Sequence, residues 1–245
     1  MPLADKYQTM KNILIAGDSW GCGEWDYLNE TRTDDYGVSH KGLQQYLVDL
    51  GHRVVNISIP GGSNRQSVEL LQKVLSIDTF DYVFWFQTDP IRNYFRFTEE
   101  SKIEKAKNWR TVADILEVQD AGLDESYGQL GKIPTTIYCI GGCSKIDIAK
   151  LSRYDNLVCL IESIPELCCP HIPHPIIHFS DWLEFIPKDF DEFDELIKIK
   201  HKSDAFFEDP DLAEYFFPDG RHANRLGHLR VFEYINSQLG LDKKI

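Results

Sequence analysis

Short runs of consecutive apolar residues alternate along the chain with segments in which apolar residues recur every three or four positions. A run without polar alternation is typical of a strand that is buried on both faces, as in a parallel sheet covered by helices. Residues 13–16 fit this description, and further strand-like runs span 53–59, 81–87, 134–140 and 156–162. We therefore predict five parallel strands.

The segments between and after these runs have the spacing of helices. Apolar residues at helical spacing occur in 41–50, 63–75, 93–130, 146–151 and 224–239. Ser63 is followed three residues later by Gln66, which is typical of a capping box at the start of a helix. Strands that alternate with helices predict an α/β fold with helices on both faces of the sheet, a three-layer α/β/α arrangement. Five strands favour the flavodoxin-like order 2-1-3-4-5.

The remaining segments are predicted to be irregular. Residues 1–10 read as a polar tail, and 20–40 as a loop rich in Gly, Asp, Glu and Thr. The segment 163–218 is rich in Pro, His, Phe and Asp, and it is too long for a simple connection. We expect it to cover the functional site or to form an interaction surface. With no linker or internal repeat, a single domain over residues 1–245 is expected.

Composition limits the classes of partner. The formal net charge of -13 argues against binding to nucleic acid, which requires a basic surface. No apolar run approaches the roughly 18 residues of a membrane helix, and the first residues lack the apolar centre of a signal peptide. The six cysteines are then expected to be reduced thiols in a cytoplasmic protein. The expected partner is a small molecule.

Candidate catalytic residues lie at the two ends of the chain. Ser19 follows the first predicted strand, at the sheet edge where ligands bind in open α/β sheets. A serine acts as a nucleophile only when a base reaches it. Asp219 and His222 stand three residues apart before the last predicted helix, and an aspartate beside an imidazole stabilises its protonated form. Ser19, His222 and Asp219 therefore fit a nucleophile, a base and its orienting partner.

Polar groups at the neighbouring strand ends fit an oxyanion hole, which needs donors aimed at the developing charge. The backbone N–H groups of Ser19 and Gly62 are two candidates, and the side chain of Gln87 or Thr88 is a third. The residues expected to contact substrate are Asp18, Trp20 and Asn64.

The segments Gly17-Asp18-Ser19-Trp20 and Asp219-Gly220-Arg221-His222 resemble the first and last blocks of the GDSL/SGNH hydrolase superfamily. The resemblance implies a flavodoxin-like fold and ester hydrolysis through a Ser-His-Asp triad, without a metal ion or other cofactor. Lipids, short acyl esters and O-acetylated sugars are the family's substrates, so a small-molecule or carbohydrate ester is implied. The family's glycine block falls on Gly62, with Gly61 as the alternative.

The third block departs from the family. Its usual pattern is Gly-x-Asn-Asp, whose Asn donates to the oxyanion, whereas residues 86–89 are Phe-Gln-Thr-Asp. Thr88 occupies the Asn position and Gln87 is the nearest amide, so either of them replaces the donor, or Asn64 reaches in from the second strand end, or activity is weak. A ligand-binding protein without catalysis and an acyltransferase are therefore the alternatives to an esterase.

Two further features favour structural roles. The segment Cys168-Cys169-Pro170-His171, with His174 and His178, contains zinc-ligand types. Adjacent cysteines rarely bind one ion, however, and the prolines favour an extended cover, so we expect no metal site. The aromatic residues Trp182, Phe185, Phe190, Phe193, Phe206 and Phe207 are expected to form a satellite core or to line a substrate pocket.

Overall fold

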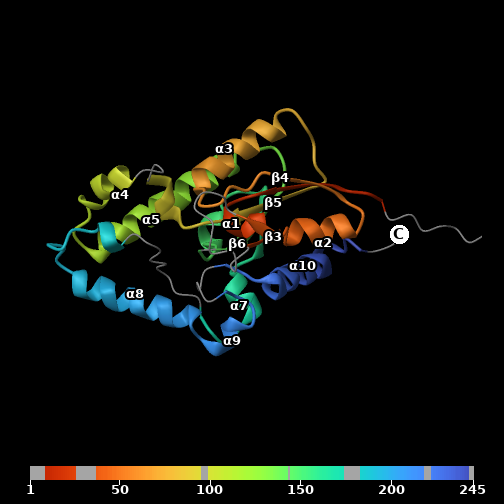
Figure 1. Cartoon of the computed structure of the whole chain (residues 1–245). Helices are drawn as coiled ribbons and strands as arrows, with labels where there is room; N and C mark the ends of the chain where they lie inside the picture. Colours follow the sequence, from red (N-terminus) through yellow and green to blue (C-terminus); the bar gives the residue numbers. More distant parts are fainter. Residues whose placement is uncertain are drawn as a thin grey trace, which may run out of the picture.

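The computed structural model describes residues 9–25, 37–94, 99–142, 144–173, 183–217 and 222–242. Five parallel strands form one sheet in the order β4-β1-β5-β6-β7 (Figure 1). They are β1 (Asn12–Ala16), β4 (Arg53–Asn56), β5 (Tyr82–Gln87), β6 (Ile137–Gly141) and β7 (Leu157–Ile161). Counted along the chain, this order is 2-1-3-4-5, so the predicted α/β fold and strand order are confirmed.

The inner strand β1 shows why its sequence lacks polar alternation. Ile13 and Ile15 belong to one buried cluster, whereas Leu14 and Ala16 belong to the cluster on the other face of the sheet. All four side chains are 0% exposed. Both faces of β1 are thus covered, and each face requires an apolar side chain.

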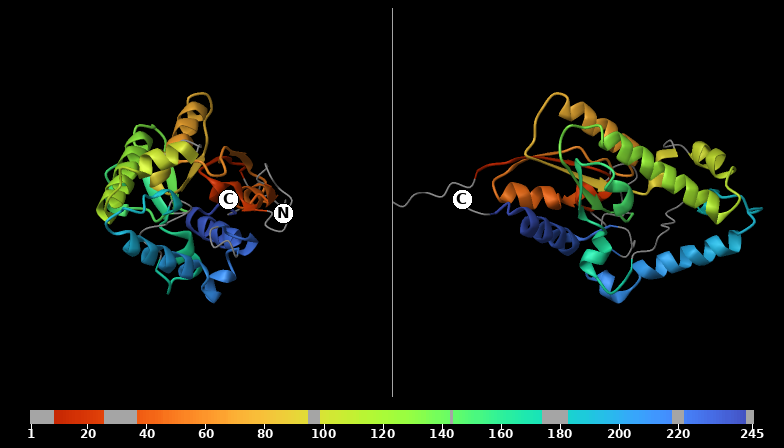
Figure 2. Two further views of the ribbon diagram at one scale, coloured as in Figure 1. Left: turned by 60° about the vertical axis from the view of Figure 1, so that its left-hand side comes forward. Right: turned by 180° about the vertical axis from the view of Figure 1, so that it is seen from behind.

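Helices cover both faces of the sheet, as Figures 1 and 2 show. The cluster of Ile13 includes side chains of α2 (Leu43–Asp49), α7 (Ile164–Cys168) and α10 (Arg225–Leu239). The cluster of Leu14 includes side chains of α3 (Asn64–Leu75), α5 (Val112–Leu130) and α6 (Ile148–Leu151). The capping box predicted at the start of α3 is confirmed, because Ser63 and Gln66 bond each other's backbone N–H at 3.2 Å.

The prediction of an irregular segment over 163–218 is wrong. It contains α7, η2 (Leu183–Phe185), α8 (Phe193–Phe207) and α9 (Pro210–Ala213). α8 buries a narrow stripe that includes Leu196 and Ser203, and charged residues on either side of this stripe hide it in the sequence. The expected satellite core includes Phe185, Phe190 and Phe193, and Trp182 lies outside the described residues.

This satellite core lies beyond the main sheet, where α4 (Glu99–Ala106) and the start of α5 meet η2 and α8 (Figure 1). A short 3-10 helix, η1 (Pro90–Tyr94), follows β5 and contributes Ile91 to it. None of the helices in the described ranges is long and apolar enough to cross a membrane.

The loop expected over 20–40 is also partly regular. It contains α1 (Ser19–Cys22) and an antiparallel pair formed by β2 (Glu24–Trp25) and β3 (Val38–His40). Elements of two to four residues are too short to show a period in the sequence. Residues 26–36, between the two strands, lie outside the described part of the chain.

Candidate active site

Ser19 is the first residue of α1, at the carboxyl end of the inner strand β1. The turn before it requires Gly17, which has a φ of +148° and whose Cβ position lies 2.6 Å from Cβ of Phe86. Asp18 then caps α1, because its Oδ1 accepts the N–H of Trp20 at 3.0 Å. Ser19 is 6% exposed. The sequence at 17–20 therefore fixes a nearly buried hydroxyl residue at the edge of the sheet where ligands bind.

The ends of the two neighbouring strands flank Ser19. On one side, Ile59 donates its N–H to the Gly17 carbonyl at 3.0 Å, just before the two glycines at 61–62. On the other side, Ala16 of β1 pairs with Trp85 of β5. Ser19 and Thr88 each follow this pair by three residues. The second and third strand ends predicted to serve the site are therefore adjacent to Ser19.

Phe216 and His222, which precede the last helix, pack against residues that follow Ser19. Trp20 contacts Phe216, with ring centroids 5.8 Å apart. Phe216 pairs with Ala223, and Phe217 donates its N–H to the His222 carbonyl at 2.9 Å. The His222 ring meets Trp25 edge-on, with centroids 4.9 Å apart. These contacts bring the segment of His222 to the edge of the sheet where Ser19 lies.

Contacts of α10, the helix that follows His222, hold it against Gly23 and Glu24. Arg225 and Glu24 form an ion pair at 2.8 Å, and the His228 ring forms a hydrogen bond with the Gly23 backbone. His228 is 2% exposed, and burial lowers its pKa to about 4, so its ring is neutral at pH 7. Asp219, the expected partner of His222, lies outside the described residues.

Asp18 and Trp20, which were expected to contact substrate, both have contacts within the fold. Asp18 is 1% exposed, and its Oδ2 lies 3.4 Å from Nη1 of Arg92 in η1. Trp20 is 4% exposed and belongs to the main core. Sequence reasoning missed Arg92. Its signal is a cation three residues after Asp89, at the end of the third predicted strand.

Gln87 is not available as an oxyanion donor, which corrects one expectation. Its Nε2 donates to Ser144 Oγ and to the Lys145 carbonyl, both at 2.8 Å, and its Oε1 accepts the Tyr127 hydroxyl at 2.6 Å. Both amide hydrogens are therefore engaged. Successive side chains of a strand point to opposite faces of the sheet, so Gln87 lies on the same face as Trp85 two residues before it. The Trp85 side chain faces α3 and α5.

Gly62 is the second correction. Its N–H donates to the Ile59 carbonyl at 2.9 Å and closes a turn through Pro60 and Gly61. Gly61 has a φ of +68°, as the third residue of such a turn requires. No atom of the described ranges lies within 4 Å of the Cβ position of Gly61, and the residue is exposed. Of the two glycines considered, Gly61 is the one that faces open space.

Thr88 presents a hydroxyl that the fold leaves unpaired. It is 1% exposed, and its Oγ1 is buried with no hydrogen-bond partner in the described part of the chain. Its backbone N–H donates to Asn64 Oδ1 at 2.8 Å, and its carbonyl accepts from Asn64 Nδ2 at 3.0 Å. The Asn64 side chain is therefore engaged with Thr88 through its Oδ1 and one of the two hydrogens of its amide nitrogen.

A metal site is not evident in the described ranges, where no group of three or more His, Cys, Asp or Glu side chains is placed to hold an ion. Cys168 and Cys169 are buried, and burial raises the pKa of the Cys168 thiol to about 12. His174 and His178 lie outside the described residues.

A cavity of about 520 Å³ lies beside the third strand end, between α5 and residues 144–147. Its walls include Pro90, Leu116, Ser144 and Lys145. Since Ser144 and Lys145 also accept hydrogen bonds from Gln87, the cavity adjoins the face of the sheet opposite to α10.

No protein-family model matches the chain. No curated protein matches it either. Among solved structures, it is similar to a lipase/acylhydrolase from Enterococcus faecalis at 15% identity, covering 94% of this chain and 95% of the other, with a TM-score of 0.41. It is also similar to a catalytic mutant of an acetylxylan esterase from Geobacillus stearothermophilus at 14% identity, covering 96% of each chain, with a TM-score of 0.45. An α/β hydrolase enzyme from the metagenome of Lake Arreo, Spain, shares 13% identity over 97% of this chain and 99% of the other, with a TM-score of 0.44.

Proposed function

We propose that this protein hydrolyses an ester through a serine nucleophile. Ser19 attacks the acyl carbon, His222 accepts its proton, and Asp219 orients the His222 ring. The observation that carries the proposal is the packing of the segment of His222 against residues 20–25, directly after Ser19. A serine at a strand end needs a base from elsewhere in the chain, and this packing supports the proposal that His222 is that base.

The reaction proceeds in two steps. Attack by Ser19 Oγ forms a tetrahedral intermediate, and its collapse breaks the bond to the alkoxide, which takes the proton from His222. The resulting acyl-enzyme is attacked by water, which His222 deprotonates, and the carboxylic acid leaves as Ser19 regains its proton. The substrate class that we propose is a small-molecule or carbohydrate ester.

Three donors are proposed for the oxyanion: the Thr88 hydroxyl and the backbone N–H groups of Ser19 and Gly61. A buried hydroxyl without a partner costs about 1–3 kcal/mol, and the oxyanion of a bound substrate would satisfy it. Thr88 Oγ1 is such a hydroxyl, at the strand end adjacent to Ser19. Each donor to the oxyanion is worth roughly a hundredfold or more in rate.

The test is hydrolysis of a short-chain aryl ester by the wild-type protein and by Ser19→Ala. We expect the substitution to lower kcat by at least about a thousandfold, because the acyl-enzyme can no longer form. Far-UV and near-UV circular dichroism of both proteins checks that the fold is unchanged. Ser76→Ala, which alters an exposed serine at the far end of α3, is the matched control and retains full activity.

Turnover by Ser19→Ala at the wild-type rate would contradict the proposal. Two further outcomes distinguish the alternatives. A wild-type protein that neither hydrolyses esters nor reacts with a fluorophosphonate would be a binding protein, an alternative that the engaged donors of Gln87 and Gly62 favour. Formation of a new ester only when an acceptor alcohol is added would instead indicate an acyltransferase.

A further inference from the structure

We propose that Asn64 is a positioning residue for the reaction, which holds Thr88 so that its hydroxyl meets the developing oxyanion. This inference rests on the proposed function. It differs from both roles expected for Asn64, which were contact with substrate and direct donation to the oxyanion.

The contacts of Asn64 form a two-point clamp on one residue. Asn64 Oδ1 accepts the Thr88 N–H at 2.8 Å, and Asn64 Nδ2 donates to the Thr88 carbonyl at 3.0 Å. Ser144 Oγ donates to the same carbonyl at 2.9 Å. Asn64 is 0% exposed, so water does not compete for these bonds. Both backbone polar groups of Thr88 are thus fixed, while its hydroxyl has no hydrogen-bond partner among the residues that the structure describes.

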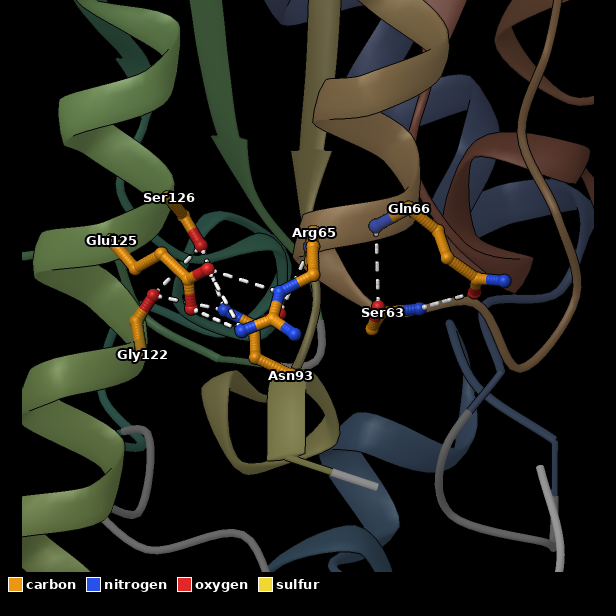
Figure 3. A network of polar contacts seen from close by, with 7 residues as sticks. All are labelled: Ser63, Arg65, Gln66, Asn93, Gly122, Glu125 and Ser126. Carbon is orange, nitrogen blue, oxygen red and sulfur yellow. Dashed lines mark hydrogen bonds and ion pairs between the residues drawn. The ribbon is translucent and has the colours of Figure 1, made fainter. Parts of the chain in front are cut away.

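The residues that follow Asn64 are held by further hydrogen bonds, and Figure 3 shows those of Arg65 and Asn93. Asn64 begins α3, and the next residue, Arg65, donates its N–H to Asn93 Oδ1 at 2.9 Å. Asn93 Nδ2 in turn donates to the Gly122 carbonyl and to Ser126 Oγ in α5, each at 3.0 Å. The first turn of α3 is therefore tied to α5. A side chain held in this way positions its partner precisely.

The orientation of the Thr88 hydroxyl depends on the backbone that Asn64 holds. A threonine has few favourable χ1 rotamers, and the backbone angles select among them. An oxyanion donor acts only when it lies about 2.7–3.1 Å from the oxyanion, and a misplacement of about 1 Å costs roughly a hundredfold in rate. Replacing Asn64 by Asp keeps its shape but places a carboxylate oxygen against the Thr88 carbonyl, which weakens the clamp.

A double-mutant cycle with Asn64→Asp and Thr88→Val tests the inference on a short-chain aryl ester. We expect Asn64→Asp to lower kcat by about tenfold to a hundredfold while KM changes by less than about threefold. Thr88→Val should lower kcat by roughly a hundredfold. The combined variant should be no slower than Thr88→Val alone, because a residue that acts only through the hydroxyl has no effect once the hydroxyl is absent.

Asn156→Asp is the matched control. Asn156 also donates its amide to buried backbone, namely the carbonyls of Leu130 and Ile133 at 3.0 and 2.9 Å, but it precedes β7 at the opposite edge of the sheet. The same chemical change there should lower stability and leave kcat unchanged. If Asn64→Asp does not fold, Asn64→Ser replaces it in the cycle, since this variant also removes the amide that donates to the Thr88 carbonyl.

Additive losses in the cycle, or a change in KM alone, would overturn the inference. If the cycle gives either result while Ser19→Ala is inactive, the proposed ester hydrolysis still stands and only the role of Asn64 is refuted. Wild-type turnover by Ser19→Ala would instead refute the proposed function itself.

Discussion

Gly17 is the residue whose identity the structure constrains most directly. Its φ of +148° disfavours any other residue, and its Cβ position lies 2.6 Å from Cβ and 2.8 Å from the carbonyl oxygen of Phe86. A side chain here would separate β1 from the end of β5. Because Ser19 and Thr88 follow these positions, the same close approach sets their spacing.

We predict that Gly17→Ala lowers the free energy of unfolding by about 3 kcal/mol, from overpacking and backbone strain together. Urea unfolding would show a lower midpoint with an unchanged slope. Gly51→Ala is the control, because Gly51 also has a positive φ, +89°, but nothing lies within 4 Å of its Cβ position. This variant should lose only about 1 kcal/mol. Equal losses in the two variants would show that contact with Phe86 is unimportant.

For single residues, the sequence predicted which strand ends carry the polar groups. It could not show which of two adjacent residues is available to the site. Gln87 and Thr88 are both polar, and only the period of two along β5 assigns the Gln87 amide to the face of α5. Gly61 and Gly62 are chemically identical. Which N–H remains available depends on a turn that closes onto Ile59, a contact that the residue types do not specify.

Among the elements, those with a wide apolar stripe and a clear cap were predicted correctly. α3 has its capping box. α10 is capped by Asn224 at its start and by Gly240 at its end, and Gly240 adopts a left-handed conformation with a φ of 62°. α8 was missed because its buried stripe is narrow and charged residues surround it. α1, β2 and β3 were missed because they are too short for a period.

The packing of α10 against Gly23 and Gly42 depends on a neutral His228. Its ring bonds the Gly23 backbone, and its Nδ1 lies 2.7 Å from the Cβ position of Gly42. Burial is the main cause that lowers the pKa of His228 to about 4, and the nearby His40 and His222 lower it further. Protonation of His228 therefore opposes the docking of α10, the helix that follows His222.

We predict that this histidine makes the protein acid-sensitive. The pKa of His228 is 6.5 in the unfolded chain and about 4 in the folded protein. Between these two pH values the unfolded chain binds a proton at His228 and the folded protein does not. The free energy of unfolding therefore falls as the pH falls through this range. By pH 4.5 the free energy of unfolding has decreased by an amount on the order of 2–3 kcal/mol.

Urea unfolding of the wild type and of His228→Gln at pH 7.5 and pH 4.5 measures this effect. The variant should lose less stability between the two pH values than the wild type, by about this amount. Because His40 and His222 are present in both proteins, the difference isolates His228. Parallel pH dependences would show that His228 does not titrate in this way.

For the whole molecule, alternation of strands and helices was enough to predict the sheet and its order, because β1 must be buried on both faces and crossovers are right-handed. The contact between the segment that follows Ser19 and the segment around His222 was predicted only from short motifs. It depends on contacts between residues about 200 positions apart, such as Trp20 with Phe216 and Glu24 with Arg225. No local pattern encodes such pairs.

The central claim is that Ser19 is a nucleophile activated by His222, and covalent labelling tests it most directly. The wild type, Ser19→Ala and His222→Gln would each be treated with a fluorophosphonate, and the adduct would be located by peptide mass spectrometry. We predict one adduct, on Ser19, that is absent from Ser19→Ala and forms at least roughly a hundredfold more slowly in His222→Gln. An adduct on another residue, or labelling of Ser19 at the same rate without the His222 imidazole, would contradict the account.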